Sequence, residues 1–379
     1  MSGLARFRAP SRGRIDGWLL LAVLALLAFG LIMISSASIV LSSEQFDSNF
    51  VYTTNQLTHV GLGLVALTIG SLIDYRLWQR WAPLLLVATF VLLLMVFIPG
   101  IGDVQRGTRG WLNLGPLSFQ AAEVAKVTLI LYFAAWFSSR KGELQSFTAG
   151  FLPFLVLLGA IVLLIMLQPD AGTTMVIVLT IVAMYVAAGL PWTHFLAGAA
   201  AGGSLLGIFI LSAPYRLQRL MTFLNPSAET LGAGYHINQA YLAIGAGGVL
   251  GLGFGQSRQK FLYLPEPHTD SIFAIAIEEL GFIRVGLVLL VLLFVILRGY
   301  RIAEYAADDF GRYVAVGITS LIAIQTFVNL GAMLGLMPLT GVTLPFISYG
   351  GSSVIALMGA VGILLNVSRQ TVVPSGRAA

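Results

Sequence analysis

The chain contains no cysteine among its 379 residues, which excludes disulfide bonds, thiolate metal sites and cysteine nucleophiles. Charge is also scarce, because Asp, Glu, Lys and Arg make up only 10% of the residues, against about 25% in a typical soluble domain. Hydrophobic residues make up 58% of the chain. This composition excludes a soluble enzyme and predicts a protein that crosses a membrane several times.

Histidine and lysine are too few or wrongly spaced for two common kinds of enzyme. The four histidines form no H-x-x-x-H pair, which argues against a zinc protease. Lysine occurs only at Lys126, Lys141 and Lys260, and none of them lies in a Walker A loop. We therefore expect neither an internal ATP motor nor a nucleic-acid partner.

Apolar runs of about 20 residues, the length that spans a bilayer, recur along the chain. The ten candidate segments are 17–39, 57–74, 82–98, 119–139, 150–168, 170–188, 193–213, 271–297, 312–336 and 346–368. We predict an all-α polytopic membrane protein of about ten transmembrane helices. A long outer loop, 214–269, would connect the seventh and eighth spans, with a short amphipathic helix at 236–244.

Basic residues predict the orientation of these spans. Four arginines precede the first apolar run, which at about 23 residues is too long for a cleaved signal peptide. Positive-inside logic then puts residues 1–16 in the cytoplasm as a basic tail. With ten spans in the membrane domain, 17–368, the C-terminal tail, 369–379, is cytoplasmic too.

Six further basic residues fall in the two predicted outer loops, 99–118 and 214–269, against the orientation rule. They are Arg106, Arg109, Arg216, Arg219, Arg258 and Lys260. Their grouping indicates an anionic ligand at the outer face. Solubilising loop charge is the alternative interpretation.

The most informative stretch is Leu264–Gly281, because carboxylates lie at or just inside the start of a long apolar segment. Keeping a carboxylate at a membrane boundary is costly, so such a group is a functional candidate. Asp270 is the strongest candidate, supported by Glu266 and His268. Capping of the helix by Thr269 or Asp270 is the alternative.

Glu278, Glu279 and Arg284 lie deeper in the same predicted span. The two glutamates would lie about 12 Å below Asp270 at 1.5 Å of rise per residue. An arginine at mid-span needs a partner, and one of the glutamates is the nearest. We favour structural neutralisation for this group over a role in the site.

Glu123 and Lys126 are three residues apart in the fourth predicted span and would share one helix face. A paired ionisable group in a membrane is a functional candidate, although such a pair can also be purely structural. Asp170, at an outer turn, either lines the same site or caps the sixth span.

The last outer loop reads T-L-P-F-I-S-Y-G-G-S-S (343–353). Proline, paired glycines and serines at the start of a span predict an interrupted helix, which membrane proteins tolerate where backbone lines a cavity. Ser348 and Ser352 are candidates for contacting a substrate there. A broken helix is also a transporter feature.

Eight segments together resemble one family. They are R-G-W-L-N-L-G (109–115), F-Q-A-A-E-V-A-K (119–126), L-Q-P-D-A-G-T (167–173), Y-R-L-Q-R (215–219), G-A-G-Y-H (232–236), Q-K-F-L-Y-L-P-E-P-H-T-D (259–270), E-E-L-G-F (278–282) and P-F-I-S-Y-G-G-S-S (345–353). They resemble the SEDS family (shape, elongation, division, sporulation), and are more similar to its FtsW and SpoVE branch than to RodA. The resemblance covers nearly all ten predicted spans.

That resemblance implies a peptidoglycan glycosyltransferase that polymerises lipid II at the outer face of the cytoplasmic membrane, in division. It assigns the family's essential aspartate to Asp270 and cavity-lining positions to Glu123, Lys126 and Asp170. It also implies a class B penicillin-binding protein as partner. Three departures from the family pattern are Ala121-Ala122 in place of proline and serine before Glu123, Arg284 in place of a small residue, and Ser271 in place of an aromatic residue.

The chemistry then expected is inverting transfer with Asp270 as general base. Lys126, the outer-loop basic residues or a divalent cation such as Mg²⁺ or Mn²⁺ would hold the departing pyrophosphate. The rival interpretation is a lipid-precursor flippase or proton-coupled transporter, which intramembrane charges and a broken helix also fit. A membrane scaffold is the third, but it would not need carboxylates at the membrane boundary.

Overall fold

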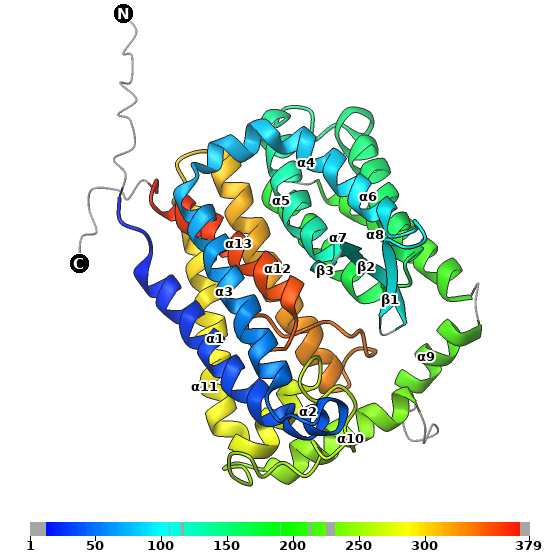
Figure 1. Cartoon of the computed structure of the whole chain (residues 1–379). Coiled ribbons are helices and arrows are strands. Elements are labelled where there is room, and N and C mark those ends of the chain that lie inside the picture. Colours follow the sequence, from blue (N-terminus) through cyan, green and yellow to red (C-terminus); the bar gives the residue numbers. More distant parts are fainter. Residues whose placement is uncertain are drawn as a thin grey trace, which may run out of the picture.

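The computed structural model of the chain describes residues 13–105, 107–114, 117–189, 191–211, 214–224 and 232–371. Within these residues the chain is mostly helical, and the long helices lie side by side in a bundle (Figure 1). A polytopic helical membrane protein is therefore confirmed as the fold class.

The helices follow the predicted apolar segments closely. In chain order they are α1 (Gly17–Ala37), α2 (Ile39–Phe46), α3 (Val51–Leu72), α4 (Tyr75–Met95), α5 (Ala121–Ser139), the π-helical turn η1 (Phe147–Phe151), α6 (Leu152–Met166), α7 (Ala171–Ala187), α8 (Trp192–Leu211), α9 (Pro214–Leu224), α10 (Ala233–Gly247), α11 (Ile272–Glu304), α12 (Asp309–Met333) and α13 (Gly351–Ser368). Each of the ten predicted segments overlaps one of these helices. Among the described residues, seven helices are long and apolar enough to cross a membrane, so the total of ten spans stays a prediction.

A small antiparallel sheet, absent from the all-α prediction, occupies the region between α4 and α5. Its strands β1 (Gly102–Gln105), β2 (Thr108–Leu114) and β3 (Leu117–Gln120) pair in the order β1-β2-β3. Strand β3 covers the start of the segment predicted as helix 119–139, so α5 begins at Ala121 instead. The strands are too short for period-two alternation to show clearly in the sequence.

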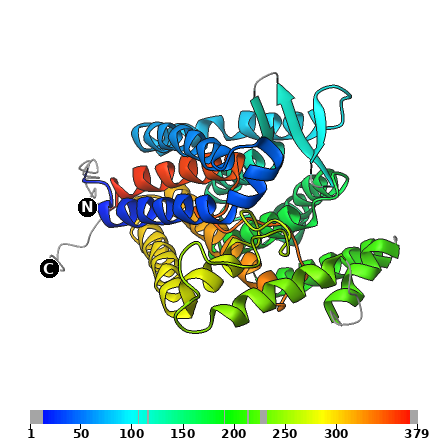
Figure 2. The ribbon, with the colours of Figure 1, turned by 60° about the horizontal axis from the view of Figure 1, so that its bottom comes forward.

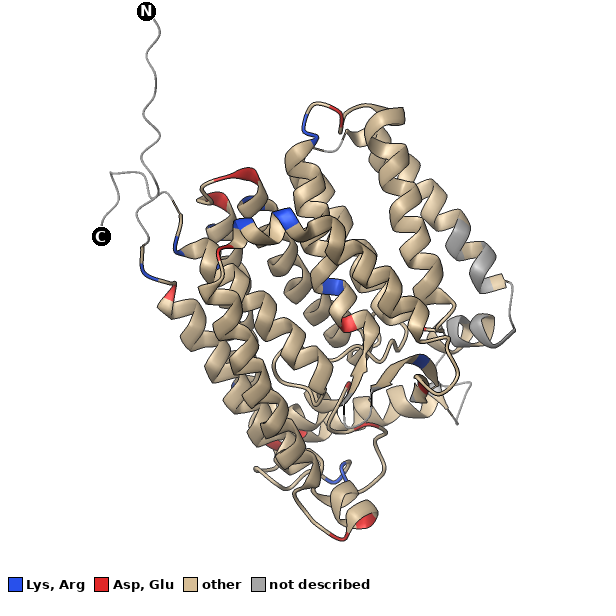
Figure 3. Cartoon of the chain, turned by 45° about the horizontal axis from the view of Figure 1, so that its top comes forward, with Lys and Arg blue, Asp and Glu red and all other residues tan. Residues whose placement is uncertain are grey.

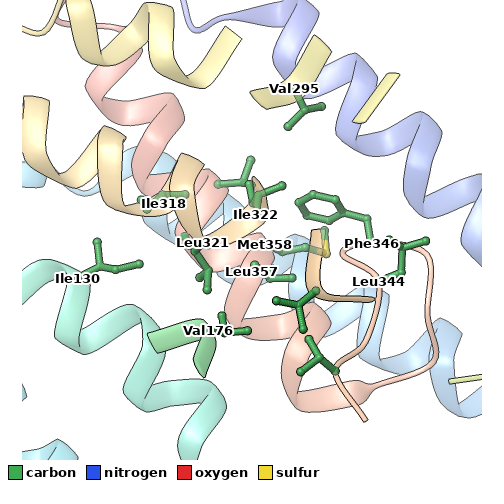
Figure 4. Close-up of a cluster of buried hydrophobic side chains, with 14 of the residues drawn as sticks. Ile130, Val176, Val295, Ile318, Leu321, Ile322, Leu344, Phe346, Leu357 and Met358 are labelled. Atoms are coloured by element: carbon green, nitrogen blue, oxygen red, sulfur yellow. The ribbon is translucent and has the colours of Figure 1, made fainter. Parts of the chain in front are cut away.

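Close helix packing in the bundle depends on small residues. A Cβ at Gly362 of α13 would lie 2.2 Å from the carbonyl oxygen of Leu67 in α3, so only glycine allows this approach. Around that contact the core is apolar, with Ile130 of α5, Val176 of α7 and Met358 of α13 among its buried side chains (Figure 4).

The segment between α12 and α13 is a non-helical stretch whose second half, around residues 342–348, is buried inside the bundle. The helix predicted at 346–368 begins only at Gly351. Leu344 and Phe346 are buried, and a Cβ at Gly30 of α1 would lie 2.6 Å from the carbonyl oxygen of Phe346. Irregular backbone at this depth therefore lies against protein rather than lipid, as the proline and glycines of the sequence predicted.

The predicted outer loop 214–269 contains two helices, α9 and α10, and α10 extends the predicted helix 236–244 at both ends. The chain after α10 folds back on α11. Gly281 interrupts α11 with φ 81° and ψ 167°, and the amide of Phe282 donates to the carbonyl of Gly248 at 3.0 Å. A side chain at Gly281 would lie 2.3 Å from Leu250, so this contact needs glycine.

The prediction that Arg284 pairs with Glu278 or Glu279 is wrong. Because of the break at Gly281, Arg284 is exposed, and its guanidinium donates to the carbonyl of Leu250 at 3.1 Å rather than to Glu278 or Glu279. No buried arginine therefore needs neutralising in this helix.

Charged residues gather near the ends of the helices, and few lie along their middles (Figure 3). The start of α1 and the end of α13 lie together, whereas α2 and α10 lie at the opposite end (Figures 1 and 2). Near the termini, Arg298 pairs with Asp16 at 2.7 Å and Arg76 with Asp308 at 3.0 Å. These ion pairs thus lie at the same end as the start of α1 and the end of α13, while the side of the membrane that this end faces stays a prediction.

Candidate active site

Asp270 lies at the end of the molecule opposite the termini, two residues before α11 begins. The hydroxyl of Thr269 lies 2.9 Å from an oxygen of Glu266 and 3.1 Å from an oxygen of Asp270. One hydroxyl thus joins two carboxylates. Asp270 does not cap α11, since the residue before the helix is Ser271 and it makes no side-chain cap.

His236 of α10 comes to the same place, although the sequence did not single it out. Its Nε2 atom lies 2.6 Å from the hydroxyl of Ser271, which in turn donates to the carbonyl of Pro265 at 2.9 Å. Since that hydroxyl has one proton, Nε2 of His236 carries a proton and donates it to Ser271. Ser271, the departure from the family pattern, therefore orients His236.

The two groups also affect each other's titration. Burial raises the pKa of Asp270 above its usual value, and the negative charge of Glu266 raises it further, while His236 and the Thr269 hydroxyl act against this. Burial lowers the pKa of His236, opposed by the charges of Asp270 and Glu266. Asp270 is consequently a stronger base than an exposed aspartate once it is ionised.

A second polar group surrounds Lys126 of α5. Its ammonium nitrogen lies 2.8 Å from Glu123 and 3.2 Å from the side-chain oxygen of Gln325, and both charged side chains are buried. The predicted pair Glu123–Lys126 is thus present and carries a third partner from α12.

Helix α12 connects the two polar groups. The side-chain amide of Asn329 donates to the backbone carbonyl of Asp270 at 2.9 Å, and Gln325, one turn away, contacts Lys126. Residues four apart share a helix face and are about 6 Å apart along the axis. Asp270 and Lys126 are therefore held at neighbouring levels of the same polar region.

Asp170 joins this region through the strand that the sequence analysis missed. It caps α7 by accepting from the amide of Thr173 at 2.9 Å, and its other oxygen accepts from Gln120 at 3.0 Å. The backbone amide of Gln120 donates to the hydroxyl of Ser352 at 3.0 Å. Asp170 therefore both caps α7 and belongs to the polar region, although the sequence analysis treated these two roles as alternatives.

His268 is buried beside two aromatic rings, with ring centroids 4.5 Å from Tyr52 and 5.2 Å from Tyr349. Its carbonyl accepts from the amide of Tyr349 at 2.9 Å, which fixes the Asp270 segment against the loop before α13. Ser348 is buried and accepts from the amide of Leu344 at 2.8 Å, so its hydroxyl shapes that loop.

Among the predicted basic contacts, Arg109 lies on β2, whose backbone bonds to Gln168 beside Asp170. Arg216 and Arg219 lie on α9, and their side chains, like the whole of Arg106, are outside what the structure describes.

Lys260 lies in the predicted outer loop, between α10 and α11, but its side chain is directed into the protein. It is buried, and its ammonium nitrogen lies 3.0 Å from Glu279, 3.2 Å from Ser36 and 2.7 Å from the carbonyl of Gly255. A buried lysine with three acceptors from the protein has a structural role, because it links the segments that supply those acceptors. Glu278 has a similar role, because it accepts from the hydroxyl of Ser257 and the amide of Arg258.

Within the described residues no three His, Asp or Glu side chains come together as a metal site. Glu266 and Asp270 are two carboxylates held around one hydroxyl, and they do not make a protein-only metal site.

Three residues of the site, His236, Gln325 and Asn329, were missed in the sequence. Gln325 and Asn329 carry a signal that was available, namely two amides four residues apart in an apolar segment predicted to span the membrane. His236 ends the segment G-A-G-Y-H that carries part of the family resemblance, but only the folding of α10 against the start of α11 brings it to Ser271.

A carboxylate with a raised pKa at one end of a helical membrane bundle, linked through α12 to a buried lysine-glutamate pair, defines a polytopic membrane enzyme. A family profile described as "Cell cycle protein", for FtsW, RodA and SpoVE, matches residues 17–372. The chain belongs to that family and is a peptidoglycan glycosyltransferase.

Individual relatives agree with this assignment. Stage V sporulation protein E of Bacillus subtilis is 46% identical over 354 residues, which cover 93% of this chain and 97% of that protein. A probable peptidoglycan glycosyltransferase FtsW of Geobacter sulfurreducens is 40% identical over 355 residues, covering 94% and 95%. A solved structure, described as a peptidoglycan synthase complex that coordinates polymerization and crosslinking, contains a chain with 29% identity and a TM-score of 0.78, covering 94% and 98%.

Proposed function

We propose that this glycosyltransferase polymerises lipid II at the outer face of the cytoplasmic membrane, with Asp270 as the general base. The observation that carries the proposal is the Asp270 carboxylate, whose pKa is raised by burial at the start of α11. A general base needs a pKa near the working pH, and burial is the usual means of raising that of a carboxylate.

The reaction proceeds by direct displacement. Asp270 accepts the proton of the acceptor sugar hydroxyl while that oxygen forms a bond to the anomeric carbon of the donor. The bond from that carbon to the pyrophosphate breaks in the same step, and its electron pair leaves with the lipid pyrophosphate. One displacement inverts the anomeric carbon, so no covalent intermediate with the enzyme is needed.

The departing group is an anion, and Lys126 is the buried cation that α12 links to the Asp270 segment, through Gln325 and Asn329. Its partners Glu123 and Gln325 fix the ammonium group in place, which is the preorganisation that stabilises developing charge. Arg109 and the α9 arginines Arg216 and Arg219 are further candidates for binding the pyrophosphate. A divalent cation, one of the alternatives given above for holding the pyrophosphate, stays a prediction. Loss of activity on addition of a chelator would support it.

We also propose a role in septal synthesis alongside a class B penicillin-binding protein. Support comes from relatives named FtsW and SpoVE, and from the similar chain in a complex described as coordinating polymerization with crosslinking.

The test is polymerisation of purified lipid II by detergent-solubilised protein, in which no transport can occur. Asp270→Asn should reduce glycan polymer by at least about a hundredfold, the lower range for losing a general base. The variant should stay folded, because a neutral amide removes the cost of burying a charge. Asp47→Asn, at an exposed aspartate after α2, is the matched control. Normal polymer from Asp270→Asn would refute the proposal.

A further inference from the structure

A cavity of about 410 Å³ opens next to the segment that carries Asp270. It lies between α2, the start of α3 and the stretch 262–268, at the end of the bundle opposite the termini (Figure 1). Its lining includes Leu41, Gln45, Tyr52, Leu262, Glu266 and His268. The volume is within the range of about 300–1,000 Å³ typical of small-molecule sites.

The lining has the chemistry of a sugar site rather than a phosphate site. The hydroxyl of Tyr52 donates to Gln45 at 2.6 Å, and the Glu266 carboxylate adds strong acceptors for sugar hydroxyls. Tyr52 and His268 add aromatic surface, against which the apolar face of a sugar ring packs. None of the described lining residues is Lys or Arg, the groups that would bind a pyrophosphate.

The cavity wall is joined to the catalytic carboxylate. Glu266 lines the cavity, and the Thr269 hydroxyl that it contacts at 2.9 Å also lies 3.1 Å from Asp270. Asp270 itself does not line the cavity and is reached from its Glu266 edge. A ring bound at that edge would present a hydroxyl toward Asp270, as a general base needs.

The wall is also held in a strained backbone conformation. Glu266 has φ 49° and Leu262 has φ 65°, values that non-glycine residues seldom adopt. At Glu266 the carbonyl accepts from the amides of Thr269 and Ser271, at 3.2 and 3.3 Å, which hold the turn in place. Strain of this kind persists where surrounding contacts enforce it, often at ligand sites.

We infer that this cavity binds the acceptor sugar, an uncharged N-acetylhexosamine ring whose hydroxyl faces Asp270. The inference rests on the proposed function and adds to it the location of one of the two substrates. Gln45, which neither the motifs nor the site above includes, becomes a binding residue, and so does Tyr52, described above only as a neighbour of His268.

Binding of the tetrasaccharide of β-1,4-linked N-acetylglucosamine, which has neither lipid nor phosphate, tests the cavity directly. The full chain in detergent should bind this probe, as measured by saturation-transfer NMR or calorimetry. Tyr52→Ala should weaken binding by about tenfold and Tyr52→Phe by less, because Phe keeps the ring. Tyr300→Ala, at an exposed tyrosine near the far end of α11, is the matched control.

Equal affinity of Tyr52→Ala and Tyr300→Ala, or no binding of the tetrasaccharide, would overturn the inference. Gln45→Ala, at an exposed side chain, gives the same test if Tyr52→Ala does not fold. In the polymerisation assay, Tyr52→Ala should raise KM with less effect on kcat. If the protein binds the tetrasaccharide but the Asp270→Asn variant still polymerises lipid II, the proposed function is refuted and the cavity assignment stands.

Discussion

Asp270 differs from the other carboxylates of the chain in what holds it. Glu278 and Glu279 are buried too, but both accept from protein donors and Glu279 pairs with a lysine. Asp270 has one hydroxyl neighbour, a histidine that interacts with it electrostatically and a nearby glutamate. A carboxylate so lightly stabilised in its charged form is suited to taking a proton.

The pH dependence of polymerisation should report this carboxylate. Activity requires ionised Asp270, so kcat/KM should fall as pH drops through its pKa, which burial raises above the usual 3.8. Glu266→Gln removes a negative charge that raises this pKa. The acid limb of the profile should therefore move to lower pH, as measured by lipid II polymerisation across a pH series.

A matched control for that shift is Glu44→Gln, at an exposed glutamate of α2 at the same end of the molecule. Its acid limb should coincide with that of the unmodified chain. An acid limb that stays in place in Glu266→Gln, or moves to higher pH, would contradict the electrostatic coupling described here.

At the scale of elements, the buried pair Lys260–Glu279 connects three parts of the chain that lie far apart in the sequence. Ser36 of α1 donates to Glu279 at 2.7 and 2.8 Å, and Lys260 reaches Glu279 from the stretch before the Asp270 segment. The pair therefore fixes the position from which that segment enters the site.

Removing one charged member of this pair should destabilise the protein more than removing both. Lys260→Met leaves Glu279 buried and uncompensated, a loss of about 3–5 kcal/mol in unfolding free energy. The double variant Lys260→Met, Glu279→Gln should recover part of that loss. Thermal melting of the purified proteins measures both, and a double variant less stable than Lys260→Met would count against the pair.

Elements also show which residues a local sequence pattern can single out. Asp270, Glu123, Lys126 and Asp170 were predicted because an ionisable group in an apolar segment is costly wherever the segment packs. The break before α13 was predicted from its proline and glycines. Each of these predictions depends only on the residue and its neighbours in the sequence, and not on which other helices pack against it.

Misplaced residues needed contacts that no local pattern contains. Lys260 was expected to contact an anionic ligand from the outer loop, but it is buried against Ser36, which is 224 positions away. Arg284 was expected to face the glutamates, and a single glycine with φ 81° turns it outward. His236 came to the site only because α10 packs on α11. Long-range packing decided each of these positions.

At the scale of the whole molecule, the arrangement separates two ends with different chemistry. Ion pairs such as Arg298–Asp16 and Arg76–Asp308 lie near the termini, whereas Asp270 and the cavity lie at the other end. Basic residues that flank spans favour the cytoplasmic side. The proposed orientation therefore puts the catalytic end outside, where glycan strands are needed.

The absence of cysteine makes this orientation directly measurable, because any introduced thiol is the only one in the chain. Ser43 lies on α2 at the catalytic end, and Ser139 is the last residue of α5, near the opposite end. Both are exposed, so a cysteine can replace each of them in turn. A membrane-impermeant maleimide should label Ser43→Cys in intact cells, with the outer membrane opened where there is one. It should label Ser139→Cys only after the cytoplasmic membrane is opened. Labelling in the reverse pattern would put Asp270 on the cytoplasmic side, and polymerisation at the outer face would then be wrong even if the chemistry at Asp270 were right.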